Sequence, residues 1–150
     1  LAQLAIAATV FPRAADLEDD LDRPRPPLTV EEVEDLLRVL SERLEEENRD
    51  KPDPAVSDEA GGLLEAWRIY RRRAAAKDER FSRIGMRRII EFGLERLRDF
   101  GCFVETQLGG KSAWQPTRRY NVMVQEFAAS RLLEEVQRVL GYNAPMDEED

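Results

Sequence analysis

Residues 94–105, Leu-Glu-Arg-Leu-Arg-Asp-Phe-Gly-Cys-Phe-Val-Glu, contain the change of pattern that decides the fold. Before the glycine, Leu94 and Leu97 lie at the spacing of one helical face. After it, side chains alternate from one residue to the next, which is typical of a strand. Gly101 suits a helix end because glycine adopts left-handed backbone angles without strain. The segment therefore predicts a helix that turns directly into a strand.

A β-hairpin is predicted from this strand and a second alternating run. The first strand covers residues 102–107, and the second covers residues 120–124. The loop between them, residues 108–119, contains two adjacent glycines and a proline, which mark turns. We therefore expect a hairpin with a long tip.

Upstream of the hairpin, residues 29–44 predict an amphipathic helix with a defined start. Thr29 and Glu32 form the Thr-x-x-Glu pattern of a capping box, in which each side chain satisfies a backbone amide of the other residue. The apolar residues fall on one helical face, and the opposite face is rich in glutamate and arginine. The predicted buried set is Val33, Leu36, Leu37, Leu40 and Leu44.

Three further segments show helical spacing. A helix over residues 58–76 would bury Leu63, Leu64, Trp67, Tyr70 and Ala74. A helix capped by Ser82 would run to Phe100 and bury Ile84, Ile89, Ile90, Leu94 and Leu97, either as one helix or divided at Gly85 and Gly93. The last helix, residues 125–140, would end at Gly141 and bury Leu132, Leu133, Val136, Val139 and Leu140.

The N-terminal 27 residues form two contrasting stretches. Residues 1–11 are apolar without a polar face, so we expect a buried helix that ends before Pro12. This stretch is far shorter than the roughly 20 residues of a membrane span. It does not begin with Met and lacks the basic start of a secretory signal, which suits a fragment of a longer chain. Residues 13–27 combine acidic side chains with proline and arginine and predict a linker or an extended arm.

Composition limits the chemistry of this 150-residue chain. It contains no histidine, so it cannot form a Ser-His-Asp or Cys-His pair, and zinc sites lose their usual ligands. Its single cysteine, Cys102, excludes an internal disulfide, so we expect a cytoplasmic protein in which this thiol is buried and inert. Carboxylates with magnesium remain the one enzymatic alternative. We expect neither catalysis nor a cofactor.

The order helix, helix, glycine, strand, loop, strand resembles the winged-helix superfamily. The residues that carry this resemblance are 94–105 and the run Arg-Arg-Tyr-Asn-Val-Met-Val at 118–124. It implies that the third helix enters the DNA major groove and that the wing contacts phosphate or the minor groove. The expected fold is mainly α with a small β-hairpin (α+β). Its parts would be a helical extension with an acidic linker (1–55), a winged-helix-like domain (56–141) and an acidic tail (142–150).

Charge is segregated along the chain. Residues 61–120 contain 14 lysines and arginines against 7 acidic residues, a net charge of +7, whereas the whole chain carries −8 and the remainder therefore −15. A basic surface of this kind binds phosphates and releases counterions. The predicted nucleic-acid-binding residues are Arg71, Arg72, Arg73, Lys77, Arg80, Arg83, Arg87, Arg88, Lys111, Trp114, Arg118 and Arg119.

Each of these features also has a simpler interpretation. The arginines would equally pair with the acidic N-terminal half. Trp67 and Trp114 are typical core or interface anchors. The run Gly-Gly-Lys-Ser at 109–112 lacks the first glycine of a phosphate loop and does not precede a helix, so we reject that site. The acidic residues 16–22 predict a solvated segment or a docking arm for a basic partner, and calcium-loop spacing is absent.

These observations favour a non-enzymatic subunit of a DNA-associated complex. The basic helix and wing would contact nucleic acid, and the acidic and apolar helices would hold a partner protein, with Leu4, Ile6 and Phe11 as partner-binding residues. More loosely, the chain is similar to the acidic, tandem-winged-helix subunits that accompany bacterial condensin-like SMC ATPases. The expected partners are DNA and a larger protein of that type, with a homodimer left open. A winged-helix transcription regulator and a purely protein-binding module are the alternatives.

Overall fold

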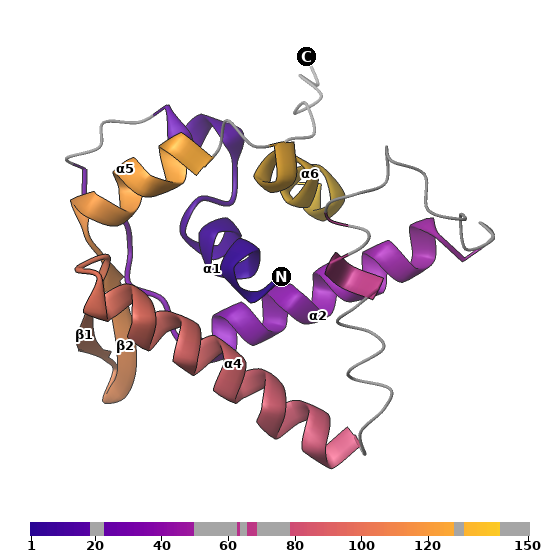
Figure 1. Cartoon of the computed structure of the whole chain (residues 1–150), viewed down its shortest axis with the longest axis horizontal. Coiled ribbons are helices and arrows are strands. Elements are labelled where there is room, and N and C mark those ends of the chain that lie inside the picture. Colours follow the sequence, from indigo (N-terminus) through magenta and orange to yellow (C-terminus); the bar gives the residue numbers. More distant parts are fainter. Residues whose placement is uncertain (19–22, 50–62, 64–65, 69–78, 128–130, 142–150) are drawn as a thin grey trace.

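A computed structural model of the chain describes residues 1–18, 23–49, 63, 66–68, 79–127 and 131–141. In this part the chain is mainly helical with one two-stranded antiparallel hairpin, which confirms the predicted α+β class (Figure 1). Of the helix predicted over 58–76, only Leu63 and 66–68 are described; they are helical, and Leu63 and Trp67 are buried. The tail 142–150 lies outside the described residues. The elements are α1 (Ala2–Val10), η1 (Ala14–Leu17), α2 (Val30–Glu47), α4 (Glu79–Asp99), β1 (Phe103–Leu108), β2 (Lys111–Pro116), α5 (Arg118–Phe127) and α6 (Arg131–Leu140).

Helix α1 lies in the middle of the molecule and confirms the predicted buried helix. It packs against α2, α4 and α6, which surround it in Figure 1. Ala5, Ile6 and Ala8 have no exposed surface, although they point in different directions around the helix. Because α1 has no polar face, it packs against several helices at once, and Ala5, Ile6, Ala8 and Val10 are buried in the core while Gln3 is exposed.

Helix α2 begins where the capping residues predicted it. The Thr29 hydroxyl accepts a hydrogen bond of 3.3 Å from the Glu32 backbone amide. Four of the five predicted core residues of this helix are buried, and Leu36 is half-buried at the edge of the core. The predicted helix and its buried face are therefore confirmed.

Helix α4 is continuous from Glu79 to Asp99, so the prediction that Ser82 caps it is wrong. Ser82 lies in the first turn, and the helix begins three residues earlier. Neither glycine divides it. Gly93 faces α1, where a side-chain Cβ would stand 3.1 Å from Gln3 Nε2, so glycine lets the two helices approach closely. Ile89 was predicted to be buried but is 49% exposed.

The predicted transition at Gly101 is confirmed. Gly101 has φ +76°, its amide donates to Arg98 O at 2.8 Å, and the Cys102 amide donates to Leu97 O at 2.8 Å. This pair of hydrogen bonds is a Schellman motif, which satisfies carbonyls at the helix end and redirects the chain. The Thr117 amide bonds to Cys102 O at 2.9 Å and fixes the base of the hairpin against the same turn.

The hairpin is tighter than predicted, because its second strand is β2 and not residues 120–124. Gly109 and Gly110, with φ +58° and +80°, form a two-residue loop, and Leu108 pairs with Lys111. Two adjacent residues with positive φ give a turn whose twist matches that of paired strands. The prediction of a long tip is therefore wrong, because residues 111–116 of the predicted loop 108–119 form β2.

Residues 118–127 form helix α5, so the strand predicted at 120–124 is wrong. Tyr120 and Val124 are buried on one helical face, while Val122 is 36% exposed. The Tyr120 ring packs on Phe103 with centroids 4.6 Å apart. The last predicted helix also differs: it is α6, beginning at Arg131, and residues 125–127 belong to α5. Its predicted core face is confirmed, with Leu132 half-buried, and Gly141 ends it with φ +76°.

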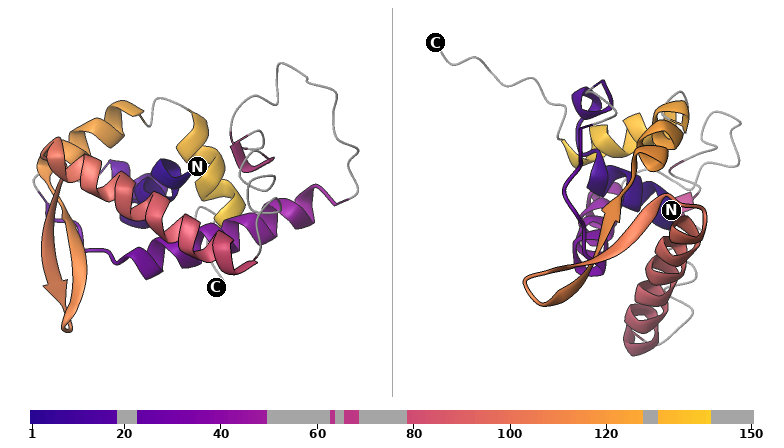
Figure 2. Two further views of the ribbon diagram at one scale, coloured as in Figure 1. Left: turned by 60° about the horizontal axis from the view of Figure 1, so that its bottom comes forward. Right: turned by 90° about the vertical axis from the view of Figure 1, so that its left-hand side faces the viewer.

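The hairpin has a third, short partner. Leu28 and Trp114 exchange backbone hydrogen bonds of 2.9 and 2.8 Å, so the residue before the α2 cap is paired with β2. Figure 2 shows the hairpin projecting from the helical body at the C-terminal end of α4. One continuous core includes residues from both the 1–55 and the 56–141 segments.

The helical assignment of residues 118–127 predicts unequal effects for two valines. Val124→Ala should destabilise the chain by about 2 kcal/mol, because it removes two methyl groups from the core. Val122→Ala should change stability by less than about 0.5 kcal/mol, since Val122 is at the surface. Urea denaturation measures both. Equal losses would contradict the helix, because a strand would place both valines on one face.

Candidate interaction surface

The outer face of α4 carries apolar side chains that the fold does not cover. Ile89, Phe92 and Phe100 are 49%, 59% and 61% exposed. They fall on one side of the helix, at spacings of three and eight residues. The Arg96 guanidinium lies 5.8 Å from the centroid of the Phe92 ring, on the same side. We call this side of α4, residues 85, 89, 92, 96 and 100, the outer seam. Contiguous exposed apolar side chains are typical of an interaction site.

Charged side chains of both signs border the outer seam. Arg88, Glu95 and Asp99 are all exposed on α4. Among the residues that the structure describes, Arg88 and Glu95 form no ion pair, whereas Asp99 lies 3.5 Å from Arg98. The border therefore contains charges of both signs, and two of them, Arg88 and Glu95, have no ion-pair partner among the described residues.

Arg87 is paired with α2, although its side chain stays 47% exposed. Its Nε donates to Glu34 Oε1 at 2.9 Å, and its Nη2 lies 3.3 Å from Glu31 Oε1. The hydrogen bond and the charge of Glu34 raise the pKa of the Arg87 guanidinium. The sequence left two interpretations of this arginine, phosphate binding or pairing with the acidic N-terminal half. The structure contains the second of these contacts.

The other predicted nucleic-acid-binding arginines and lysines have different positions. Arg71, Arg72, Arg73 and Lys77 lie outside the described residues, and Arg80 and Arg83 lie in the part of α4 whose side chains are not described. Arg88 is exposed at the border of the outer seam. Lys111, at the start of β2, and Arg118 and Arg119, at the start of α5, are also exposed. A shallow hollow on α5 is lined by Arg118, Arg119, Val122, Met123 and Glu126.

Trp114 is a core residue and is not at the wing tip. It is 6% exposed and pairs through its backbone with Leu28. The Arg98 guanidinium covers the ring at 5.9 Å from its centroid and also pairs with Glu105 on β1. Trp114 therefore anchors the hairpin to the helical body, and its ring is not available for stacking on a base.

The three residues predicted to bind a partner protein belong to α1 or follow it. Ile6 is fully buried and Phe11 is 3% exposed, both in the core of this chain. Leu4 is partly buried against the same core. Two of the three side chains are therefore buried within this chain and have almost no surface to offer a partner.

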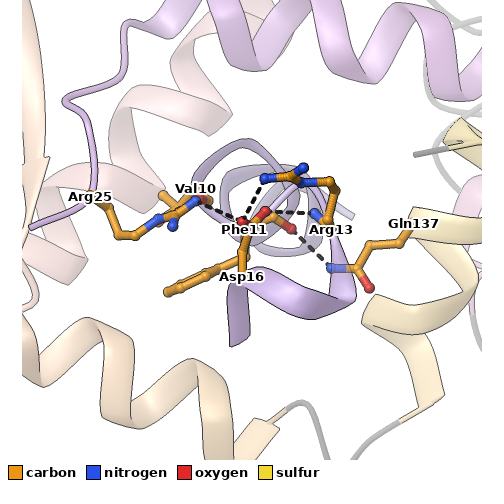
Figure 3. Close-up of polar contacts among 6 residues, drawn as sticks. All are labelled: Val10, Phe11, Arg13, Asp16, Arg25 and Gln137. Atoms are coloured by element: carbon orange, nitrogen blue, oxygen red, sulfur yellow. Dashed lines mark hydrogen bonds and ion pairs between the residues drawn. The ribbon is translucent and has the colours of Figure 1, made fainter. Parts of the chain in front are cut away.

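The acidic segment after α1 is folded where it is described. Asp16 is only 5% exposed, and its carboxylate accepts hydrogen bonds from the Arg13 backbone amide at 3.0 Å and from Arg13 Nη2 at 3.3 Å (Figure 3). Arg25 lies 3.7 Å from the same carboxylate and donates to Val10 O at 3.0 and 3.2 Å. Asp16 therefore pairs with two arginines and is not solvated as predicted, whereas Glu18 is exposed and residues 19–22 of the predicted acidic segment lie outside the described residues.

One buried polar residue escaped the sequence analysis. Gln137 has no exposed surface, and its Nε2 donates to Phe11 O at 3.0 Å (Figure 3). Its burial could have been predicted, because Gln137 lies on the apolar face of the last helix, beside Leu133 and Val136. A polar residue in such a position needs a buried partner, and the end of α1 supplies one.

No group of three or more metal-binding side chains occurs within the described ranges. Burial raises the pKa of the Cys102 thiol, an effect that nearby Arg119 opposes. A thiol with a raised pKa is a poor nucleophile at neutral pH, as expected of a structural cysteine. No described helix is both long and apolar enough to cross a membrane.

Reversing the charge of Arg87 should weaken the fold. Arg87→Glu places a third carboxylate beside Glu31 and Glu34, so its urea midpoint should fall below that of Arg88→Glu, the neighbouring arginine that pairs with none of the described residues. Glu34→Lys should restore much of the midpoint in the Arg87→Glu background. The difference should shrink in about 1 M salt, where the Debye length is roughly 3 Å. Equal midpoints for the two single variants would show that the ion pairs do not hold α2 to α4.

The chain was compared with protein-family models, with curated proteins and with solved structures, and none of the three comparisons found a match.

Proposed function

We propose that this chain is a non-enzymatic, winged-helix-like subunit of a DNA-associated complex, and that the outer seam of α4 is its protein-binding surface. The observation that carries this proposal is the exposure of Ile89, Phe92 and Phe100 on a helix whose other side is in the core. Protein interfaces are enriched in aromatic side chains at their centres, and polar or charged side chains surround these centres.

The order of elements supports the winged-helix-like part of the proposal. A short pairing at Leu28 precedes α2, and α4 then runs directly into a hairpin whose second strand pairs with Leu28. A winged helix likewise has a helix followed by a projecting hairpin. An assembly built around a bacterial condensin-like SMC ATPase is our candidate complex, and it rests on the general resemblance of the sequence to the accessory subunits.

The chemistry of the outer seam favours protein over DNA at this surface. A helix that reads the major groove presents polar side chains to base edges and cations to phosphates. Here α4 presents Ile89 and Phe92, and Glu95 and Asp99 beside them would repel phosphates. Desolvating the two apolar side chains would stabilise a protein complex instead.

Direct DNA contact is a second candidate function at a different place. Lys111 on the hairpin and Arg118 and Arg119 at the start of α5 are exposed. Cations on a projecting hairpin are suitably placed for phosphate contact. This candidate needs only the hairpin and α5, so it is compatible with a protein partner on α4.

The protein-binding proposal predicts that Phe92→Asp removes association with protein partners while the chain stays folded. A charge in the middle of a desolvated contact costs several kcal/mol, which corresponds to a loss of at least about 100-fold in affinity. Affinity purification of the tagged chain from its native host detects associated proteins, and sedimentation of the pure protein detects self-association. Leu108→Asp, at another exposed apolar residue, is the matched control. If Phe92→Asp left every association intact, the outer seam would not be the binding surface.

The DNA candidate predicts salt-dependent binding of a duplex. Affinity should fall steeply between about 50 and 200 mM salt, because bound cations release counterions from the duplex. Lys111→Glu and Arg119→Glu should each weaken binding and lower the salt slope by roughly one unit. Arg38→Glu, an exposed arginine on α2, should leave the affinity unchanged. Absence of binding at low salt would eliminate this candidate.

A further inference from the structure

The outer seam has the spacing of a coiled-coil contact. Gly85, Ile89, Phe92 and Arg96 follow one another at intervals of four, three and four residues, which is the a/d repeat of paired helices. All four positions lie on one side of α4, and Ile90 and Leu94 on another side pack into the core. α4 lies at the edge of the helical body in the right-hand view of Figure 2, and Ile89 and Phe92 on its outer side are 49% and 59% exposed.

The sizes of these side chains are self-complementary in one orientation. If two α4 helices run antiparallel about a two-fold axis, Ile89 faces Phe92 of the second copy, and Arg96 lies over Gly85 of the second copy. Among the described residues, no atom lies within 4 Å of the position that a Cβ at Gly85 would take, so the described part of this end of the seam leaves space for the arginine. The long arginine stem can cover the glycine while the guanidinium stays in water.

The charges are complementary in the same orientation. Arg88 and Glu95 each directly precede a seam position, Ile89 and Arg96 respectively, and therefore lie at the same edge of the contact. In an antiparallel pair, residues at this edge face each other across the seam, so Arg88 of each copy meets Glu95 of the other. Both are exposed and form no ion pair with the described residues. A two-fold contact would thus gain two ion pairs.

The parallel orientation lacks these matches. It would place Arg96 against Arg96 and would bring Arg88 toward Gly93, which is buried against α1. Like charges at the centre of a seam are destabilising, and glycine offers no charge.

From these matches we propose that the partner of the outer seam is a second copy of this chain, held by antiparallel pairing of the two α4 helices. The inference rests on the proposed protein-binding role of α4 and specifies the partner. The contact is isologous, so it closes as a dimer and does not extend into a filament. The dimer carries two hairpins, each with its own Lys111 and Arg119, related by the two-fold axis.

The test is sedimentation equilibrium of the pure chain and its variants. The wild type should form dimers, and Phe92→Asp should be monomeric, whereas Leu108→Asp should dimerise like the wild type. Far-UV circular dichroism and the urea midpoint show whether each variant is folded. A wild-type chain that remained monomeric up to about 1 mM would overturn the dimer. The α4 face would then retain a protein-binding role only if Phe92→Asp still abolished association with a different protein.

The two charge variants test the orientation. Arg88→Glu and Glu95→Arg should each weaken the dimer roughly tenfold, because two ion pairs become two like-charge contacts. The double variant should recover the wild-type affinity. An equimolar mixture of the two single variants should form a heterodimer that also recovers it, since each copy then meets its opposite charge. Dimerisation without these recoveries would reject the antiparallel arrangement.

Discussion

The structure depends on the burial of α1, a helix that has no polar face. Ala5, Ile6 and Ala8 lose all their exposed surface only because α2, α4 and α6 surround them. The absence of a Cβ at Gly93 allows α4 to approach within contact of Gln3 and Ile6. Helices from the first 50 residues and from the last 70 must therefore meet around one element.

A buried helix end needs partners for its carbonyls, and this need accounts for several distant contacts. Arg25 donates to Val10 O, Gln137 donates to Phe11 O, and Asp16 compensates the charge of Arg25 (Figure 3). Removing one partner would leave a charged or polar group buried without compensation, which costs more than the contact itself contributes. The segment after α1 is folded onto the core for this reason.

Charge in this chain serves two purposes. Acidic α2 and basic α4 attract each other through Arg87, and Arg98 joins α4 to the hairpin through Glu105 and the Trp114 ring. These arginines join elements of the fold through ion pairs, and their side chains stay 47% and 41% exposed. Arg88, beside the exposed aromatic residues of α4, forms no ion pair with the described residues, and Lys111, Arg118 and Arg119 are exposed on the hairpin and at the start of α5.

Local signals in the sequence determined the start of α2 at Thr29, the end of α4 at Gly101 and the buried faces of α2 and α6, because caps and helical periodicity act within a few residues. Residues 120–124 were ambiguous, since Tyr120 and Val124 satisfy both an alternating pattern and a helical one. In the folded chain these residues form a helix, whose buried Tyr120 packs on Phe103. The tight Gly109-Gly110 turn, which pairs the strands early, left them out of the sheet.

For the candidate site, the sequence determined that catalysis by histidine is impossible and that basic residues are concentrated in the middle of the chain. Only the tertiary structure separated the arginine that binds α2 from its exposed neighbour, placed Trp114 in the core, buried Asp16 and left Ile89 and Phe92 uncovered. Whether a charged or apolar side chain is free depends on residues distant in sequence that pack against it. That information is present in no local pattern and arises when α1, α2 and α4 come together.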